Sequence, residues 1–162
     1  MTDAEEALSD HVAYQQRADE HELTTTPFDA VVETSSGGET EYRVIVTVPT
    51  LDAVVEGESV ADVVEDGWFE TLELRLDSPE QVTTGLDAID SSVTRTGEEV
   101  RVEMRFSSQN PERAAENAKA LAEFVEGTWV QGIIPGYEYG GPASSLMERA
   151  TQNYEGDESE RN

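Results

Sequence analysis

Two histidines are the side chains of this sequence best suited to acid–base or metal chemistry near neutral pH. His11 and His21 lie ten residues apart among acidic neighbours such as Asp10 and Glu20. Two ligands on one helical face need a spacing of three or four residues, and a zinc site needs a further converging ligand. The sequence has no cysteine, which excludes disulfides, thiol nucleophiles and cysteine-based metal sites. We therefore predict that the protein holds no metal and no cofactor.

Motifs for other kinds of catalysis are missing from the sequence. It contains no Gly-x-Ser-x-Gly nucleophile elbow and no glycine-rich loop followed by Lys-Ser or Lys-Thr. A mechanism that uses carboxylates alone stays open, because the chain has 36 acidic residues. Nothing selects which of them would act, so no catalytic residue is assigned and enzymatic activity is left undecided.

Three arginines make a candidate anion site. Strand alternation places Arg43, Arg101 and Arg105 on the face of a sheet opposite its apolar residues. Such arginines either hold an anionic ligand or pair with cross-strand acids such as Glu41 and Glu103, and pairing is the favoured interpretation. The net charge of −26 and the lack of a basic stripe argue against nucleic acid as a partner.

An aromatic, glycine- and proline-rich segment over residues 128–141 is the other candidate site. Trp129, Tyr137 and Tyr139 form a candidate interaction surface, because aromatic side chains supply large contact areas and keep a polar group. The alternative is a covering segment that packs Trp129 and Ile133 into the core. We expect Trp129 and Ile133 to anchor the segment and its Tyr137–Tyr139 end to stay accessible to a protein partner or a second copy.

Hydrophobic periodicity predicts the elements that position these residues. Strands over 28–34 and 41–48 form one hairpin, and strands around Val93 and 100–106 form a second one with a two-residue turn near Gly97. Asn110 and Pro111 are typical of the start of a helix, which Gly127 is predicted to end. This helix should cover one face of the sheet through Leu121 and its apolar neighbours.

The other segments give weaker patterns. Residues 1–23 fit a weakly anchored amphipathic helix, and Pro142 is predicted to begin a last short helix. Residues 59–76 fit one helix, or a helix over 59–65 followed by a fifth strand over 68–76, which is favoured. The polar tail 155–162 is predicted to be disordered. Together these elements predict a single α+β domain over residues 1–154, with a mostly antiparallel sheet and helices on one face.

The charge indicates the environment of the protein. Asp and Glu number 36 against 10 basic residues, of which only Lys119 is a lysine. The acids are spread through periodic segments, and molar salt would screen their repulsion to a Debye length of about 3 Å. The composition is typical of a halophilic protein. No apolar stretch approaches a membrane span and the N-terminal residues lack the pattern of a signal peptide, so we expect a cytoplasmic protein without membrane contact.

Four phrases of the sequence resemble an uncharacterised family of haloarchaeal proteins. They span residues 26–30, 48–53, 67–72 and 124–137, and the likeness runs from Thr26 to Tyr139. The family is known only as a domain of unknown function, so the resemblance implies no catalytic residue, cofactor or partner.

Two hypotheses about function follow. The first is a non-enzymatic interaction or binding domain that uses the aromatic segment 128–141, with a protein partner or by self-association. The alternative is a small-ligand-binding protein or enzyme with an anion site on the open sheet face. A cavity beside the three arginines would favour the alternative, and an apolar patch containing Tyr137 and Tyr139 would favour the first. The sequence indicates neither the ligand or partner nor the oligomeric state.

Overall fold

The computed structural model describes residues 4–17, 20–26, 28–35, 40–83, 85–86, 88–134 and 138–140. The predicted last helix from Pro142 and the tail 155–162 lie outside these residues. The elements in chain order are α1 (Ala4–Asp10), β1 (Tyr14–Arg17), β2 (Glu20–Leu23), β3 (Asp29–Ser35), β4 (Thr40–Pro49), α2 (Leu51–Val54), β5 (Val55–Glu56), α3 (Asp62–Arg75), the 3-10 helix η1 (Pro79–Val82), β6 (Asp90–Thr96), β7 (Glu99–Ser108), α4 (Pro111–Gln131) and β8 (Glu138–Tyr139).

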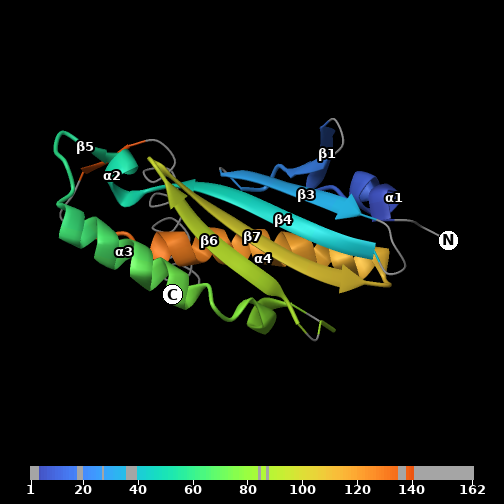
Figure 1. Cartoon of the computed structure of the whole chain (residues 1–162). Helices are drawn as coiled ribbons and strands as arrows, with labels where there is room; N and C mark the ends of the chain where they lie inside the picture. Colours follow the sequence, from blue (N-terminus) through green and yellow to red (C-terminus); the bar gives the residue numbers. More distant parts are fainter. Residues whose placement is uncertain are drawn as a thin grey trace, which may run out of the picture.

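Six antiparallel strands form the main sheet in the order β1-β2-β3-β4-β7-β6 (Figure 1). β5 and β8 pair separately as a small antiparallel sheet. The predicted α+β class and the two central hairpins, β3–β4 and β6–β7, are confirmed. In the second hairpin Thr96 pairs with Glu99, which confirms the two-residue turn, and Gly97 takes a φ of 61° that glycine adopts without strain.

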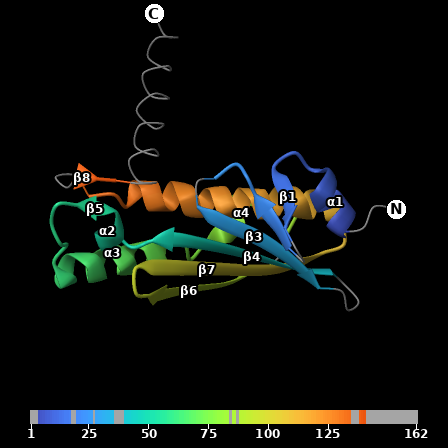
Figure 2. The ribbon, with the colours of Figure 1, turned by 90° about the horizontal axis from the view of Figure 1, so that it is seen from above.

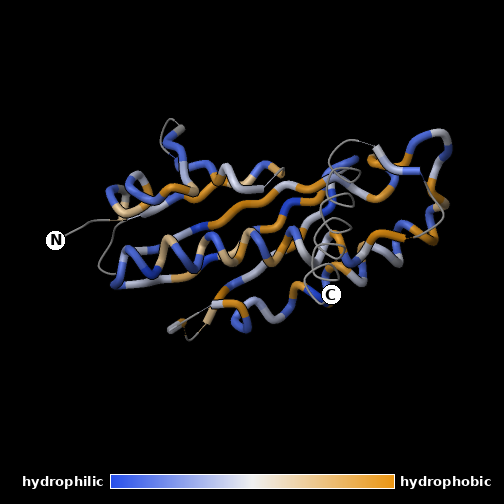
Figure 3. The backbone as a smooth tube through the Cα atoms, turned by 180° about the vertical axis from the view of Figure 1, so that it is seen from behind, coloured by the Kyte–Doolittle hydropathy of each residue, from blue (hydrophilic) through white to orange (hydrophobic). Residues whose placement is uncertain are grey.

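The long helix α4 runs along one face of the sheet (Figure 2). The side chain of Asn110 accepts a hydrogen bond of 3.1 Å from the backbone N–H of Arg113, and Pro111 occupies the first turn, as predicted. Hydrophobic and hydrophilic residues follow one another along the turns of α4 (Figure 3). The buried apolar residues of α4 are Ala114, Ala115, Ala118, Leu121, Ala122, Val125 and Trp129. The small alanine side chains let the helix approach the sheet closely.

The core face of the sheet comes from alternate residues of β4 and β7, as their period of two predicts. The two sets are Tyr42, Val44, Val46 and Val48 on β4, and Val100, Val102, Met104 and Phe106 on β7, and all are buried. Tyr42 and Phe106 are register partners whose rings stack with centroids 5.2 Å apart. Leu121 is fully buried, which confirms the predicted arrangement of helix over sheet.

The end of α4 differs from the prediction. The helix does not stop at Gly127 but continues to Gln131, with Gly132 as its C-cap. A glycine inside a helix costs only about 1 kcal/mol, and the burial of Trp129 in the next turn offsets this cost. A side chain at Gly132 would place its Cβ 3.2 Å from Nε1 of Trp68, so this glycine permits α3 to approach the end of α4.

The favoured interpretation of residues 59–76 is wrong. Residues Asp62–Arg75 form the single helix α3, and no fifth strand covers 68–76. Trp68, Leu72 and Leu76 are buried at a spacing of four residues, whereas Leu74 is exposed. A strand would have placed Leu72, Leu74 and Leu76 on one face, so tertiary packing selected the helical period over the alternating one.

The predicted N-terminal helix over residues 1–23 is also wrong beyond its first turns. α1 ends at Asp10, and β1 and β2 form a third hairpin in which Tyr14 pairs with Leu23. Leu8, Tyr14 and Leu23 are buried in the common core, so the segment is firmly anchored. The Tyr14 hydroxyl donates a 2.7 Å hydrogen bond to the carbonyl oxygen of Ala115 on α4, and burial raises the pKa of this tyrosine.

Candidate functional site

The three predicted arginines lie on the open face of the sheet, opposite the core. Arg43 on β4 and Arg105 on β7 are direct register partners, while Arg101 is flanked by Thr47 and Thr94. Two like charges in opposite positions repel each other unless acidic side chains lie between them. Strand alternation therefore predicted the face of these residues correctly, and their charge partners decide what they can bind.

Arg43 forms ion pairs with acidic neighbours. Its guanidinium donates hydrogen bonds to Glu103 and, at 3.2 Å, to Glu33. The hydrogen bond between them raises the pKa of Arg43 and lowers the pKa of Glu103. Arg101 lies 4.0 Å from the same glutamate. The predicted pairing with Glu103 is confirmed, but Glu33 on β3, a partner that sequence reasoning missed, takes the place that was expected for Glu41.

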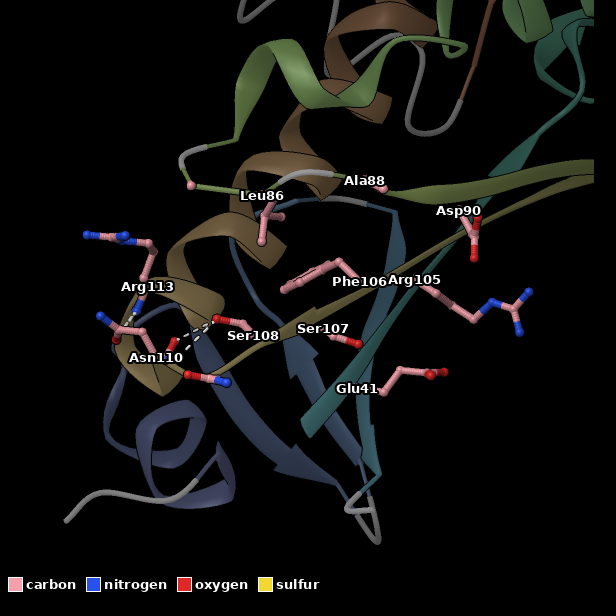
Figure 4. Close-up of a pocket in the computed structure, with 12 residues that line it drawn as sticks. Glu41, Leu86, Ala88, Asp90, Arg105, Phe106, Ser107, Ser108, Asn110 and Arg113 are labelled. Carbon is pink, nitrogen blue, oxygen red and sulfur yellow. Dashed lines mark hydrogen bonds between the residues drawn. The ribbon is translucent and has the colours of Figure 1, made fainter. Parts of the chain in front are cut away.

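Arg105 has a different environment. Among the described residues no carboxylate oxygen lies within 4.0 Å of its guanidinium or of the guanidinium of Arg113. Both arginines line a cleft of about 620 Å³ between the end of β7, the start of α4 and the connection before β6 (Figure 4). The sequence did not point to Arg113, because nothing in the spacing of the first turn of an amphipathic helix distinguishes it from other exposed arginines.

Trp129 does not contribute to the predicted interaction surface, because its side chain lies in the core. Trp129 is only 1% exposed, and its ring meets that of Phe28 edge to face at 5.2 Å. The prediction that Trp129 anchors the segment is confirmed. The prediction that Trp129 lies on an interaction surface is wrong. Tyr139 on β8 is half-buried and its hydroxyl donates a hydrogen bond to the carbonyl oxygen of Ile134. Tyr137 lies outside the described residues.

An exposed apolar face occurs on α3 instead. Val63 and Leu74 are 78% and 77% exposed, and helical geometry puts them on the same side of the helix with Gly67 and Glu70 between them. We call these four residues the α3 outer face. Assigning Leu74 to a strand hid this face in the sequence, although the spacing of Val63, Gly67, Glu70 and Leu74 was the signal for it.

α3 is held in place by its opposite side. Trp68 and Leu72 are buried in the core, and Arg95 of β6 donates a hydrogen bond of 2.9 Å to Asp66. The guanidinium carbon of Arg95 also lies 4.8 Å from the centre of the Phe69 ring, a cation–π distance. These contacts and the buried side chains hold α3 with its outer face turned away from the core.

The two histidines have different partners and different burial. His11 contacts Glu116 at 2.5 Å, and the backbone N–H of Ala13 donates to its Nδ1, so Nε2 carries the ring proton. His21 is buried, with its Nε2 3.1 Å from the Ser9 hydroxyl. Within the described part of the chain, no group of three histidine, aspartate or glutamate side chains is placed to hold a metal ion.

Comparisons with known proteins identify a family. Among the described residues, no helix is long and apolar enough to span a membrane. The comparison with curated proteins and the comparison with solved structures gave no match. A family described as "Family of unknown function (DUF5813)" matches residues 9–149, which is most of the chain. The protein therefore belongs to this family of unknown function, DUF5813.

Proposed function

We propose that this protein is an interaction domain that binds an apolar, basic segment of another protein on the α3 outer face. The observation that carries the proposal is the exposure of Val63 and Leu74 on one side of a helix whose other side is well packed. Full burial of one such side chain contributes about 1.5–3 kcal/mol, which this chain leaves unused. The interaction-domain hypothesis from the sequence is thereby kept, and its surface moves from segment 128–141 to α3.

Gly67 supports a close contact on this face. A Cβ added at Gly67 would meet no atom within 4 Å, so no packing inside the domain requires a glycine there. Glycine in a helix interior costs about 1 kcal/mol relative to alanine, and it exposes the helix backbone. A partner helix lying between Val63 and Leu74 could approach α3 most closely at this point.

The length of the face also suits a helical partner. Val63 and Leu74 are eleven residues apart, which is about 16 Å along a helix axis at 1.5 Å per residue. A partner helix with apolar residues at intervals of three or four positions would meet both side chains. Recognition would then follow the helix-in-groove pattern, in which a few apolar anchors carry the affinity.

Charge selects the class of partner. Asp62, Glu70 and Glu73 are exposed on α3, and Arg75 is the only basic residue of the helix. A second copy of the chain would bring these acids of two α3 helices into close contact, where salt screens repulsion much less than at a distance, and this disfavours self-association through this face. A partner with lysine or arginine beside its apolar residues would be attracted instead.

We also propose that the protein works at high ionic strength. It would then be a halophilic protein of the haloarchaeal cytoplasm. The support for this is the excess of 36 acidic over 10 basic residues. In such an environment the Debye length is about 3 Å, so charge contributes little at a distance and apolar contacts carry more of the affinity. This is a second reason to look to Val63 and Leu74.

The test uses an amphipathic peptide of leucine and lysine as the probe. Its affinity is measured by fluorescence anisotropy in molar KCl for the wild type, Val63→Gln/Leu74→Gln and Val12→Gln. The double variant keeps the charge of the protein, so it leaves general attraction to the peptide unchanged. Val12 is 96% exposed and lies away from α3, which makes it the matched control.

We expect the double variant to bind the peptide at least tenfold more weakly, since about 1.4 kcal/mol of lost contact gives that factor. The Val12→Gln variant should bind like the wild type. Equal affinity of the double variant and the wild type would contradict the proposal. Equal weakening by Val12→Gln would also contradict it, because the peptide would then be recognising exposed apolar residues in general.

A further inference from the structure

The free edge of β6 is a second feature, independent of the α3 outer face. β6 is the last strand of the main sheet, and among the described residues it pairs with β7 alone (Figure 1). Proteins usually protect such an edge with a proline, a lysine, a bulge or a very short strand, because an open edge can pair with another chain. β1, at the other end of the sheet, has only four residues. β6 has seven residues, neither proline nor lysine, and an unbroken register with β7.

The backbone groups that point out of this edge belong to Ser91, Val93 and Arg95. Residues of an antiparallel pair are hydrogen-bonded to the neighbouring strand at every second position, beginning with the two residues that flank a tight turn. Thr96 flanks the turn, so it and every second residue before it bond to β7. The carbonyl oxygen of Glu98 accepts a 2.9 Å hydrogen bond from the N–H that follows β4, which fits the same alternation. Among the described residues, no contact outside the sheet occupies the outward groups.

The charge of Arg95 does not block the edge. This side chain lies on the core side of β6, where a free charge would keep other strands away. It donates a hydrogen bond of 2.9 Å to Asp66, and its guanidinium carbon lies 4.8 Å from the centre of the Phe69 ring. The arginine is therefore neutralised. Because the end of a long side chain makes these contacts, α3 stands away from the backbone of β6, and all residues of the strand except Val93 are exposed.

A second copy of β6 fits this edge in one antiparallel register. The register centred on Val93 is the one that uses the outward groups of all three residues. Val93 would exchange both hydrogen bonds with Val93 of the second copy, and Ser91 would exchange both with Arg95 of the second copy. The small Ser91 side chain would then lie opposite the arginine that carries α3, which leaves room for this helix.

The same register brings no like charges together. On the open face Asp90 would lie opposite Thr96 of the second copy, and Ser92 opposite Thr94. Such pairs of hydroxyl side chains stabilise neighbouring strands. Asp90 and Arg95 are the only charged residues of β6, so the strand has no net charge. Molar salt screens the more distant acids of the two copies to a Debye length of about 3 Å.

We infer that two copies of this protein pair through their β6 edges and form a dimer with twofold symmetry and one continuous antiparallel sheet. This interaction goes beyond the proposed docking of a basic partner segment, and it uses none of the α3 outer face. The occupant of the edge is thus a second copy of the chain, because the strand matches itself in its outward groups, in side-chain size and in charge.

The first test is sedimentation equilibrium of the full chain in molar KCl over a range of protein concentrations. The variants are Val93→Pro and, as the matched control, Val93→Thr. Proline removes the outward N–H at the centre of the edge and leaves the hydrogen bonds to β7 in place, because the N–H of residue 93 does not point to β7. Threonine keeps the N–H and the β-branched shape. Circular dichroism shows whether both variants are folded.

The second test does not depend on a proline variant that folds. The chain has no cysteine, so single cysteines introduced at Val93, Ser91 and Val12 can form disulfides only between copies. Position 93 lies opposite itself in the dimer, at a Cα separation of about 5.5 Å, which a disulfide spans. Position 91 lies opposite Arg95, and Val12 is exposed on the N-terminal segment.

We expect the wild type and Val93→Thr to form reversible dimers, and Val93→Pro to dissociate at concentrations about tenfold higher or more. Under mild oxidation Val93→Cys should form a covalent dimer faster than Ser91→Cys and Val12→Cys. A wild type that stays monomeric at every concentration, a folded Val93→Pro variant that dimerises as tightly as Val93→Thr, or equally fast crosslinking of the three cysteine variants would each overturn the inference.

Discussion

The indole N–H of Trp129 donates a hydrogen bond of 2.9 Å to the backbone carbonyl oxygen of Pro49, eighty residues earlier in the chain. This bond joins the last turn of α4 to the end of β4, and the indole ring is buried while Pro49 is half-buried. The N-terminal side of segment 128–141 is therefore part of the core of the domain. Trp129 is thus unavailable to a partner, and the docking surface that we propose is the α3 outer face.

The first prediction concerns this bond. Replacing Trp129 by Phe removes the donor of the bond to the half-buried Pro49, which should lower the free energy of unfolding by about 0.5–1.5 kcal/mol. Trp129→Ala should lower it by about 3–5 kcal/mol through lost packing. Denaturant unfolding in molar KCl measures both, with Val12→Ala as an exposed control expected to stay within about 0.5 kcal/mol. A Trp129→Phe variant as stable as the control would show that the bond contributes nothing.

The second prediction separates two exposed glycines. A Cβ would meet no atom within 4 Å at Gly67 or at Gly97, so neither substitution by alanine causes a clash. Gly67 lies in a helix, and Gly67→Ala should raise the free energy of unfolding by about 0.5–1 kcal/mol. Gly97 has a φ of 61°, which alanine adopts only with strain. Gly97→Ala should therefore lower the free energy of unfolding by about 1–2 kcal/mol. Thermal melts show whether each variant is more or less stable than the wild type. A destabilised Gly67→Ala variant would mean that α3 is not an ordinary helix at this point.

The third prediction concerns pH. The hydrogen bond from Arg43 holds the pKa of Glu103 below its ordinary value of 4.5, so the folded state favours the carboxylate. The stability from this group is present above pH 4.5 and is lost as pH falls through the lower pKa of the folded state. Glu103→Gln should therefore be less stable than the wild type near neutral pH, and the difference should shrink below pH 4.5.

Glu41→Gln is the control for this experiment, because it removes the same charge from the same sheet face without breaking the bond to Arg43. Unfolding is followed by circular dichroism from neutral pH into the acid range at constant ionic strength. A difference between Glu103→Gln and the wild type that stays constant across the acid range would contradict the role of the bond.

The fourth prediction concerns salt. The acidic side chains behind the net charge of −26 repel one another in dilute buffer, and molar KCl screens that repulsion. The melting temperature should rise steeply from low salt to molar KCl. Sucrose at matched water activity is the control for a general effect of solutes on burial. If the melting temperature were equal at the two salt concentrations, the proposal of a halophilic protein would fail.

Much of the central fold was predictable from local patterns. The alternation in residues 42–48 and 100–106 selects strands with one buried face, and the Asn110–Pro111 pair marks the start of α4. The missed features depend on contacts between distant residues. Gly127 is tolerated inside α4 because Trp129 finds Phe28 and Pro49, and the β1–β2 hairpin forms because Tyr14 reaches Ala115 on α4.

The candidate sites were less predictable than the fold. Alternation placed Arg43, Arg101 and Arg105 on the open face correctly, but the partner Glu33 comes from another strand. The cleft lined by Arg105 and Arg113 needs the helix start, the strand end and the segment before β6 in one place, which no local spacing encodes. The α3 outer face was encoded in the spacing of Val63 and Leu74, and the competing strand pattern of Leu72, Leu74 and Leu76 concealed it.

The central claim, that the α3 outer face is a docking surface, is tested most directly by photo-crosslinking to the leucine–lysine peptide in molar KCl. A photoreactive residue replaces Glu70 at the centre of the face in one variant. In two other variants it replaces Val12 and Arg101, on the N-terminal segment and the open sheet face. We predict crosslinks from position 70 that unlabelled peptide competes away, and only background levels from positions 12 and 101. Crosslinks that are as strong from position 101 as from position 70 would contradict the account, because they would place the docking surface on the sheet.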